Sequence, residues 1–171
     1  MNARDTILSA IRAAAVPPSP PAPPPTLPAS PRDLLEQFLH ILSTVGGHGI
    51  ARTGTQTVSD ILSEIATTLG VTNRADILLV PGRFAVAENG AVYVDAADFT
   101  ARADIVRVEH LVITVPREAL VPTMHDAVRR IPAHSACGWF LSGPSKTADI
   151  EQALVIGAQG ARTLHVIVDS A

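Results

Sequence analysis

The chain has 171 residues, of which 47% are hydrophobic and only 17% are charged, a composition that suits one compact α/β domain with a sizeable core. The formal net charge of −3 gives no reason to expect binding to nucleic acid or to an anionic membrane surface. The single cysteine, Cys137, excludes both a disulfide framework and a cysteine-ligated iron–sulfur cluster within one chain.

The first 31 residues form two segments of different composition. Residues 1–15 carry Ile7, Leu8 and Ile11 at helical spacing, which predicts a short N-terminal helix. Charged residues interrupt this segment, so it resembles neither a signal peptide nor a membrane span, and we expect a cytoplasmic protein. Residues 16–31 hold nine of the fourteen prolines, which predicts a linker without helix or strand because proline lacks a backbone donor.

Residues 32–171 show alternating helix and strand patterns. Apolar spacing predicts helices at 32–45 and 58–69, each followed by glycine. The apolar run at 76–80 predicts a strand covered on both faces. Further strands are predicted at 48–51, 84–87, 91–94, 105–115, 136–141 and 164–168, and further helices at 118–131 and 146–156. This alternation predicts an α/β fold with a mostly parallel sheet flanked by helices.

The segment LSGPSKTADIEQALVIGAQG, from Leu141 to Gly160, has the pattern most suggestive of binding. A turn of small residues follows a predicted strand and leads into a predicted helix. The backbone N–H groups at a helix N-terminus attract anions, and this loop adds hydroxyls and a lysine. The alternative is an ordinary helix cap. The residues expected to hold an anion, such as a small carboxylate or a phosphate, are Ser142, Gly143, Ser145, Lys146 and Thr147.

Two further side chains could carry chemistry. Glu88 precedes Asn89-Gly90 at a predicted strand end, where it could act as a nucleophile or general base, or serve only as a hairpin turn residue. His110 begins an apolar strand and could transfer a proton, or merely cap that strand. Because sites in open α/β sheets collect at strand carboxyl ends, we expect Glu88 and the Ser142–Thr147 loop to share a cleft, with His110 nearby. The six histidines lack metal-ligand spacing.

Four motifs in this order resemble the LUD-domain family, the group of lactate-utilisation protein C. They are AENG at 87–90, HLVI at 110–113, SGPSKTADIE at 142–151 and LHVIV at 164–168. The resemblance implies the fold shared by ribose-5-phosphate isomerases, glucosamine-6-phosphate deaminases and CoA transferases. The AENG segment also resembles the Glu-Asn-Gly turn in which class I CoA transferases carry their nucleophile, and Glu88 stands at the matching position.

The family resemblance also implies a function. It implies a part in the oxidation of L-lactate to pyruvate, as a cluster-free subunit that acts with an iron–sulfur partner and other lactate-utilisation proteins. Two alternatives remain open. One is a stand-alone enzyme that uses Glu88 on a small phosphorylated or CoA-linked substrate. The other is a non-catalytic interaction module that reaches a partner through the N-terminal helix and the proline-rich linker. The residues imply no particular cofactor.

Overall fold

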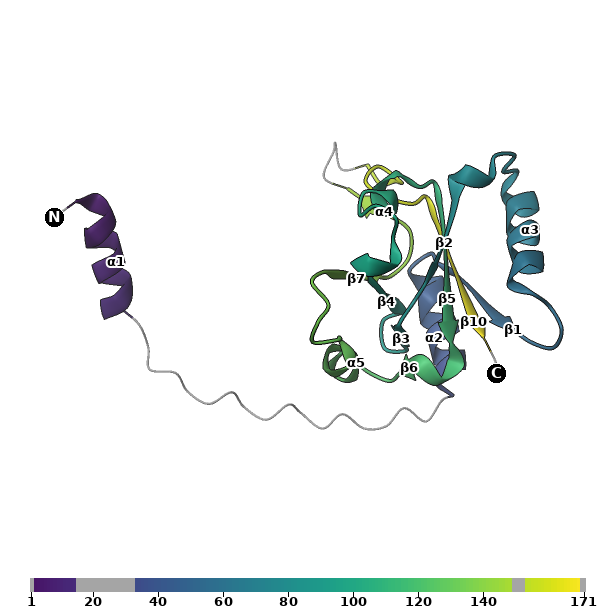
Figure 1. Ribbon diagram of the computed structural model, residues 1–171, viewed down its shortest axis with the longest axis horizontal. Coiled ribbons are helices and arrows are strands. Elements are labelled where there is room, and N and C mark those ends of the chain that lie inside the picture. The colour runs from purple at the N-terminus through teal and green to yellow at the C-terminus, as the bar shows by residue number, and fades with distance from the viewer. Residues whose placement is uncertain (1, 15–32, 149–152, 170–171) are drawn as a thin grey trace.

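The computed structural model describes residues 2–14, 33–148 and 153–169 (Figure 1). The predicted linker at 16–31 therefore lies outside the described residues. The predicted N-terminal helix is present as α1 (Ala3–Ala13), whose first turn is capped by the side chain of Asn2. No residue of α1 is buried, and the side chains of Ile7 and Ile11 are exposed. Among the described helices, none combines the length and the apolar character needed to cross a membrane.

A four-stranded parallel sheet forms the centre of the fold. Its strands, in spatial order, are β1 (His48–Arg52), β10 (Thr163–Asp169), β5 (His110–Pro116) and β2 (Ile77–Pro81). Helix α2 (Leu34–Thr44) covers one face and α3 (Val58–Leu69) covers the other (Figure 1). The predicted α/β architecture, with a mostly parallel sheet flanked by helices, is confirmed.

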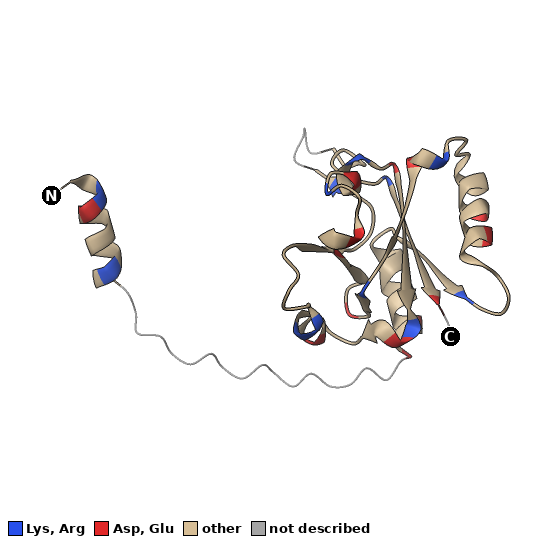
Figure 2. Ribbon diagram, in the orientation of Figure 1, with Lys and Arg blue, Asp and Glu red and all other residues tan. Residues whose placement is uncertain are grey.

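Side-chain alternation divides the apolar residues of these strands between the two faces. Leu111 and Ile113 of β5 pack in the cluster that contains Phe38 of α2. Val112, between them in the chain, packs with Ile61 in the cluster under α3. Charged groups lie mainly at the ends of the strands and on the outer helices (Figure 2). Apolar burial on both faces therefore holds the two helices on the sheet.

The prediction that the run at 76–80 is covered on both faces is wrong for part of β2. Leu79 remains 42% exposed, whereas Val80 is 2% exposed. The reason is the position of β2 at the edge of the sheet, where β5 is its one neighbour among the described strands. An edge strand has a neighbour on one side only, so its outer side chains are covered less completely.

A second, mixed sheet lies beside the first. Its strands, in spatial order, are β6 (Leu120–Val121), β3 (Phe84–Val86), β4 (Ala91–Asp95) and β7 (Gly138–Leu141). Strands β3 and β4 form the hairpin predicted around Asn89-Gly90. Gly90 has φ of 68°, which glycine adopts readily. Helix α5 (Met124–Arg130) packs on this sheet through Ala127, in a cluster with Phe84 and Tyr93, whose rings stack at 4.9 Å.

Two predicted elements have different boundaries in the structure. The predicted helix at 118–131 is shortened to α5, because Pro122 favours an extended Val121 and Thr123 caps the helix through the Asp126 N–H. The predicted strand at 105–115 begins only at His110. Residues 104–107 instead form the single-turn helix α4 (Asp104–Arg107).

The prediction of a helix at 146–156 is wrong for both described parts of that range, residues 146–148 and 153–156. The described residues form two short antiparallel strands, β8 (Lys146–Thr147) and β9 (Val155–Ile156). Their β-branched side chains favour extended backbone. The Ser145 carbonyl accepts from the Gly157 N–H at 2.9 Å, which closes the base of this hairpin. Strand pairing has replaced the helix that the local pattern indicated.

Candidate functional site

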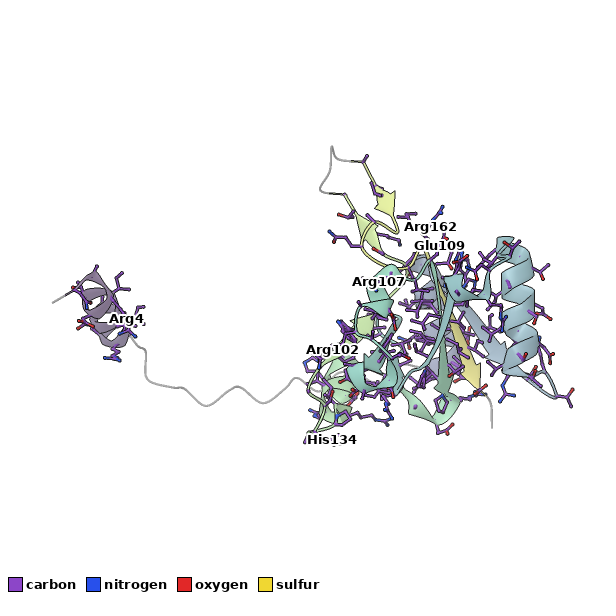
Figure 3. All side chains as sticks on the ribbon, turned by 45° about the horizontal axis from the view of Figure 1, so that its top comes forward. Arg4, Arg102, Arg107, Glu109, His134 and Arg162 are labelled. Carbon is purple, nitrogen blue, oxygen red and sulfur yellow. The ribbon has the colours of Figure 1, made fainter. Side chains whose placement is uncertain are left out.

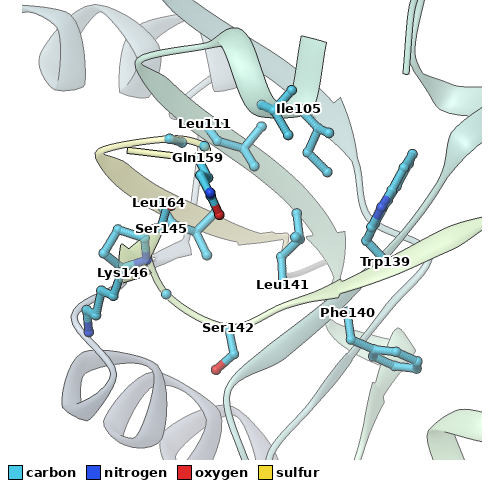
Figure 4. Close-up of a pocket in the computed structure, with 15 residues that line it drawn as sticks. Ile105, Leu111, Trp139, Phe140, Leu141, Ser142, Ser145, Lys146, Gln159 and Leu164 are labelled. Atoms are coloured by element: carbon cyan, nitrogen blue, oxygen red, sulfur yellow. The ribbon is translucent and has the colours of Figure 1, made fainter. Parts of the chain in front are cut away.

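A hollow of about 360 Å³ lies where α4, the end of β7 and the loop before β10 meet (Figure 4). Leu111 and Leu164, the second residues of β5 and β10, line it. The hollow therefore lies at the amino ends of these two parallel strands, but at the carboxyl end of β7. Its position differs from the usual location of sites in parallel sheets, at the strand carboxyl ends.

One wall of the hollow is apolar. Ile105 and Leu111 lie on this side, together with Trp139 of β7 (Figure 4). The indole of Trp139 meets the ring of Phe99 edge to face, with ring centroids 5.6 Å apart. This geometry is favourable between aromatic rings and fixes the orientation of the indole. Trp139 nevertheless stays partly exposed, as does Val106 at the rim, with 55% exposure.

The opposite wall is the Ser142–Thr147 loop, which several hydrogen bonds hold in place. The Ser142 hydroxyl donates to the Asn89 carbonyl at 2.8 Å, and the Ser145 N–H donates to the Ala161 carbonyl at 2.9 Å. Gly143, with φ of 77°, approaches α2 so closely that an added Cβ would lie 2.3 Å from the Val45 carbonyl oxygen. The loop therefore joins the β3–β4 turn, the end of α2 and the segment before β10.

Lys146 is engaged at the C-terminal end of α2. Its ammonium donates to the carbonyl oxygen of Val45, the C-cap residue of that helix. Helix C-termini carry partial negative charge, which a lysine stabilises. The prediction of an anion site at a helix N-terminus is therefore wrong in its structural basis. The loop leads into a strand, and the helix end that it meets is the negative one.

Other polar groups of the loop region remain available to a ligand. The Ser145 hydroxyl and the Gln159 amide line the hollow, and neither bonds to another described residue through its side chain. Lys146 is the only charged residue among the described lining residues. Figure 4 shows the Gln159 amide near the middle of the view, between the apolar wall and the loop. Thr147, in β8, is outside this lining.

Two arginines stand next to lining residues in the chain. Arg107 follows the lining residue Val106, and Arg162 follows the lining residue Ala161. The Arg162 guanidinium is paired with the Glu109 carboxylate at 2.7 Å. Figure 3 shows Arg107 on the same side of the molecule as this pair. The local charge distribution, with no acidic residue among the described lining residues, favours an anionic over a cationic ligand.

Glu88 lies at the same end of the second sheet as Ser142, but its carboxylate is directed elsewhere. The exposed carboxylate accepts a hydrogen bond from the Met124 N–H at 2.8 Å, at the first residue of α5. A carboxylate is favourable at a helix N-terminus. The described lining of the hollow does not include Glu88. The expected common cleft is therefore not formed by the Glu88 side chain, although the turn and the loop are adjacent through Asn89.

His110 lies on the other face of the parallel sheet. Its Nδ1 is 2.9 Å from the Thr163 hydroxyl, on the face covered by α3. The next residue, Leu111, points to the opposite face and lines the hollow. The expectation that His110 lies near the loop in one cleft is therefore wrong, because a strand directs successive side chains to opposite faces.

A cluster of three histidines occupies the amino end of the α3 face. The rings of His48 and His165 stack at 4.8 Å, and His110 is nearby. Burial, together with the proximity of His48 and His110, lowers the pKa of His165 to about 4. Its Nδ1 is buried and has no hydrogen-bond partner among the described residues. The described residues contain no group of His, Cys, Asp or Glu placed to hold a metal ion.

Two features of the site were missed by sequence reasoning. Trp139 appeared only as part of a predicted apolar strand, and Gln159 only as one residue of the Leu141–Gly160 segment. No local pattern distinguishes a strand tryptophan that lines a hollow from one in the core. The His48–His165 stack depends on the parallel register of β1 and β10. Only the paired strands bring these two histidines together.

The fold and site are those of an α/β domain with a ligand-sized hollow beside a Gly-Pro turn. The family model for the LUD domain matches residues 63–168. This match covers more than half of the chain, and the chain belongs to the LUD-domain family. The region also includes most of the sheet and the complete loop, so the resemblance predicted from the four motifs is confirmed.

Curated relatives extend this comparison. The chain is 30% identical over 104 residues to lactate utilization protein C of Halalkalibacterium halodurans, covering 56% of this chain and 45% of that protein. It is 34% identical over 103 residues to lactate utilization protein C 1 of Bacillus mycoides, covering 56% and 44%. The matches thus span less than half the length of these relatives.

A solved structure supports the fold. The chain resembles the crystal structure of a DUF162 family protein from Deinococcus radiodurans with a TM-score of 0.57. The likeness covers 84% of this chain and 100% of that chain, at 19% sequence identity. At this identity the comparison supports the architecture alone.

Proposed function

We propose that this protein acts in L-lactate utilisation and that the hollow beside the Ser142–Thr147 loop binds a carboxylate. The names of the relatives, lactate utilization protein C, motivate the process. The observation that carries the binding proposal is the hollow itself. It combines the Ser145 hydroxyl and the Gln159 amide with Lys146 as its only charged lining residue among those described.

The hydrogen-bonding groups suit a carboxylate. Its oxygens can accept from the Ser145 Oγ and from the Gln159 Nε2, both of which are donors. Lys146 adds positive charge, but its hydrogen bond to the Val45 carbonyl oxygen leaves fewer of its N–H donors for a ligand. Binding would therefore depend on neutral donors more than on a dedicated ion pair.

The electrons released by lactate oxidation need an acceptor. We propose that this acceptor is an iron–sulfur cluster on a partner chain. Cys137 is the only cysteine of this chain, and cysteine-ligated clusters need several thiolates. The protein would then act as the cluster-free subunit of a complex that converts lactate to pyruvate.

The proposal assigns no binding role to Glu88 or His110. Glu88 bonds to the N-terminus of α5, and His110 lies on the α3 face. A catalytic role for either stays a prediction, and the stand-alone enzyme that depends on Glu88 is the less supported alternative. Thr147, outside the described lining, likewise stays a predicted ligand residue only.

Growth on L-lactate tests the proposed process. A strain lacking the gene should fail to grow on L-lactate and grow normally on pyruvate, and the wild-type gene should restore lactate growth. Complementation with Ser145→Ala combined with Gln159→Leu should restore it poorly, because the hollow loses its neutral donors. Ser59→Ala, on an exposed part of α3, is the control and should restore growth fully. Normal lactate growth of the deletion strain would contradict the proposal.

A further inference from the structure

The hollow beside the Ser142–Thr147 loop has more room than lactate needs. Its volume is about 360 Å³. Binding sites for ordinary organic ligands begin at about this size, roughly 300 Å³. Lactate, whose only apolar group is one methyl, would leave most of the space to water.

The lining is divided into two chemically different parts. Ser145, Lys146 and Gln159 supply the polar groups, whereas Ile105, Leu111 and Trp139 form the apolar wall. A ligand that fills the hollow therefore needs an anionic or polar end and an apolar body. A small hydrophilic anion would bind to the polar groups and leave the apolar wall in contact with water.

The apolar wall contains surface that a ligand could cover. Val106 lines the rim with 55% exposure, and Trp139 is only partly buried although it packs on Phe99. Exposed apolar surface at a concave site is a recurrent feature of ligand binding. An indole held in one orientation by an edge-to-face neighbour is a suitable partner for another planar group.

We infer that the ligand of this hollow is a carboxylate that carries an aromatic or comparably bulky apolar group. The carboxylate lies against Ser145 and Gln159, and the apolar group lies against Trp139, Ile105 and Val106. This inference rests on the proposed carboxylate site and specifies its ligand class. It requires no covalent step and no additional residue.

Binding of two matched acids to the purified full-length protein tests the inference. L-lactate and L-3-phenyllactate share the 2-hydroxy acid head and differ by one phenyl ring. Titration calorimetry measures both affinities. Trp139 is the only tryptophan of the chain, so its fluorescence reports directly on the wall of the hollow. We expect phenyllactate to bind about tenfold or more tightly, because it buries more apolar surface.

Variants separate the two parts of the hollow. Val106→Ser should reduce phenyllactate affinity several-fold and reduce lactate affinity much less, because lactate has no group that reaches this wall. Val128→Ser, at a position of matched exposure (56%) on α5, should change neither. Ser145→Ala should weaken both acids by a similar factor. Because Val106 is an exposed residue of α4, its substitution should leave folding intact.

Each outcome decides the inference. Tighter binding of phenyllactate that depends on Val106 supports it. Equal affinity for the two acids, or binding of lactate only, overturns it while leaving the proposed carboxylate site in place. Binding of neither acid overturns both the ligand class and the carboxylate site, and growth on L-lactate then decides separately whether the protein takes part in lactate utilisation.

Discussion

The two faces of the parallel sheet differ in whether polar side chains near the amino ends of the strands are accessible or buried. On the α2 face, the Ser142–Thr147 loop bonds to neighbouring segments and leaves a hollow with accessible hydrogen-bonding groups. On the α3 face, His165 is buried, and its Nδ1 has no described partner. Successive residues contribute to both faces, since Leu164 lines the hollow and His165 faces α3.

This difference shows that one sequence motif can serve two unrelated purposes. The HLVI motif contains His110, which bonds to Thr163 under α3, and Leu111, which lines the hollow. A polar residue in a conspicuous motif therefore need not belong to the site beside it. Substitutions on the α3 face should change how the free energy of unfolding depends on pH. Substitutions on the α2 face should change the free energy of unfolding itself and the affinity for a ligand.

The largest expected effect concerns His165 and pH. Its pKa is about 4 in the folded protein and about 6.5 when unfolded, so the unfolded state binds the extra proton. The contribution of His165 to stability is complete above pH 6.5 and is lost as the pH falls toward 4. The loss should reach roughly 3 kcal/mol as an upper limit, at about 1.4 kcal/mol for each pKa unit. Urea unfolding between pH 7.5 and 4 measures it.

The matched variants for this prediction are His165→Leu and His125→Leu. His125 is an exposed residue of α5. His165→Leu should flatten the decline in stability below pH 6.5, whereas His125→Leu should retain it. An unchanged pH profile in His165→Leu would mean that this histidine is not the main acid-sensitive group of the α3 face.

Gly143→Ala should give the largest effect on the α2 face. The added methyl would lie 2.3 Å from the Val45 carbonyl oxygen, at a backbone φ of 77°. We expect a loss of about 2 kcal/mol in the free energy of unfolding, together with weaker carboxylate binding. Denaturant titration measures the former. Gly54→Ala is the control, because φ is 67° but, apart from its two chain neighbours, no described residue has an atom within 4 Å of the added methyl. Equal losses in both variants would show that backbone conformation alone, and not contact with α2, requires glycine.

Lys146→Met should cost about 1 kcal/mol by removing the donor at the C-terminal end of α2. Lys146→Arg, which retains a charged donor, should recover part of this stability. Thermal unfolding in the presence and absence of a carboxylate ligand distinguishes the two roles of the residue. If Lys146→Met abolishes binding without changing the stability of the free protein, the lysine serves the ligand and not the helix.

Glu88→Gln should have the smallest effect, about 0.5 kcal/mol, because the amide oxygen can still accept from the Met124 N–H while the favourable charge at α5 is lost. Lactate growth should be unaffected. Loss of growth with unchanged stability would instead support the predicted catalytic role of this carboxylate. Glu118→Gln, a carboxylate near the start of β6, is a suitable control.

The sequence by itself determined those elements whose signals act within a few residues. Helix α3 begins at the Thr57–Asp60 capping box and ends at Gly70, and both signals are visible in the chain. The β3–β4 hairpin follows from Asn89-Gly90 between two apolar runs. The family resemblance likewise depended on local motifs, which the LUD-domain match confirms.

For other residues, only the tertiary structure decided whether they belong to a helix or a strand and which side chains they contact. Val155 and Ile156 follow a pattern compatible with a helix, but pairing of β9 with β8 makes them strand residues. Lys146 gains its partner because the loop packs on the end of α2, about a hundred positions away in the chain. His48 and His165 stack through the parallel register of β1 and β10. These outcomes depend on contacts between distant segments, whose combined burial and pairing outweigh local preference.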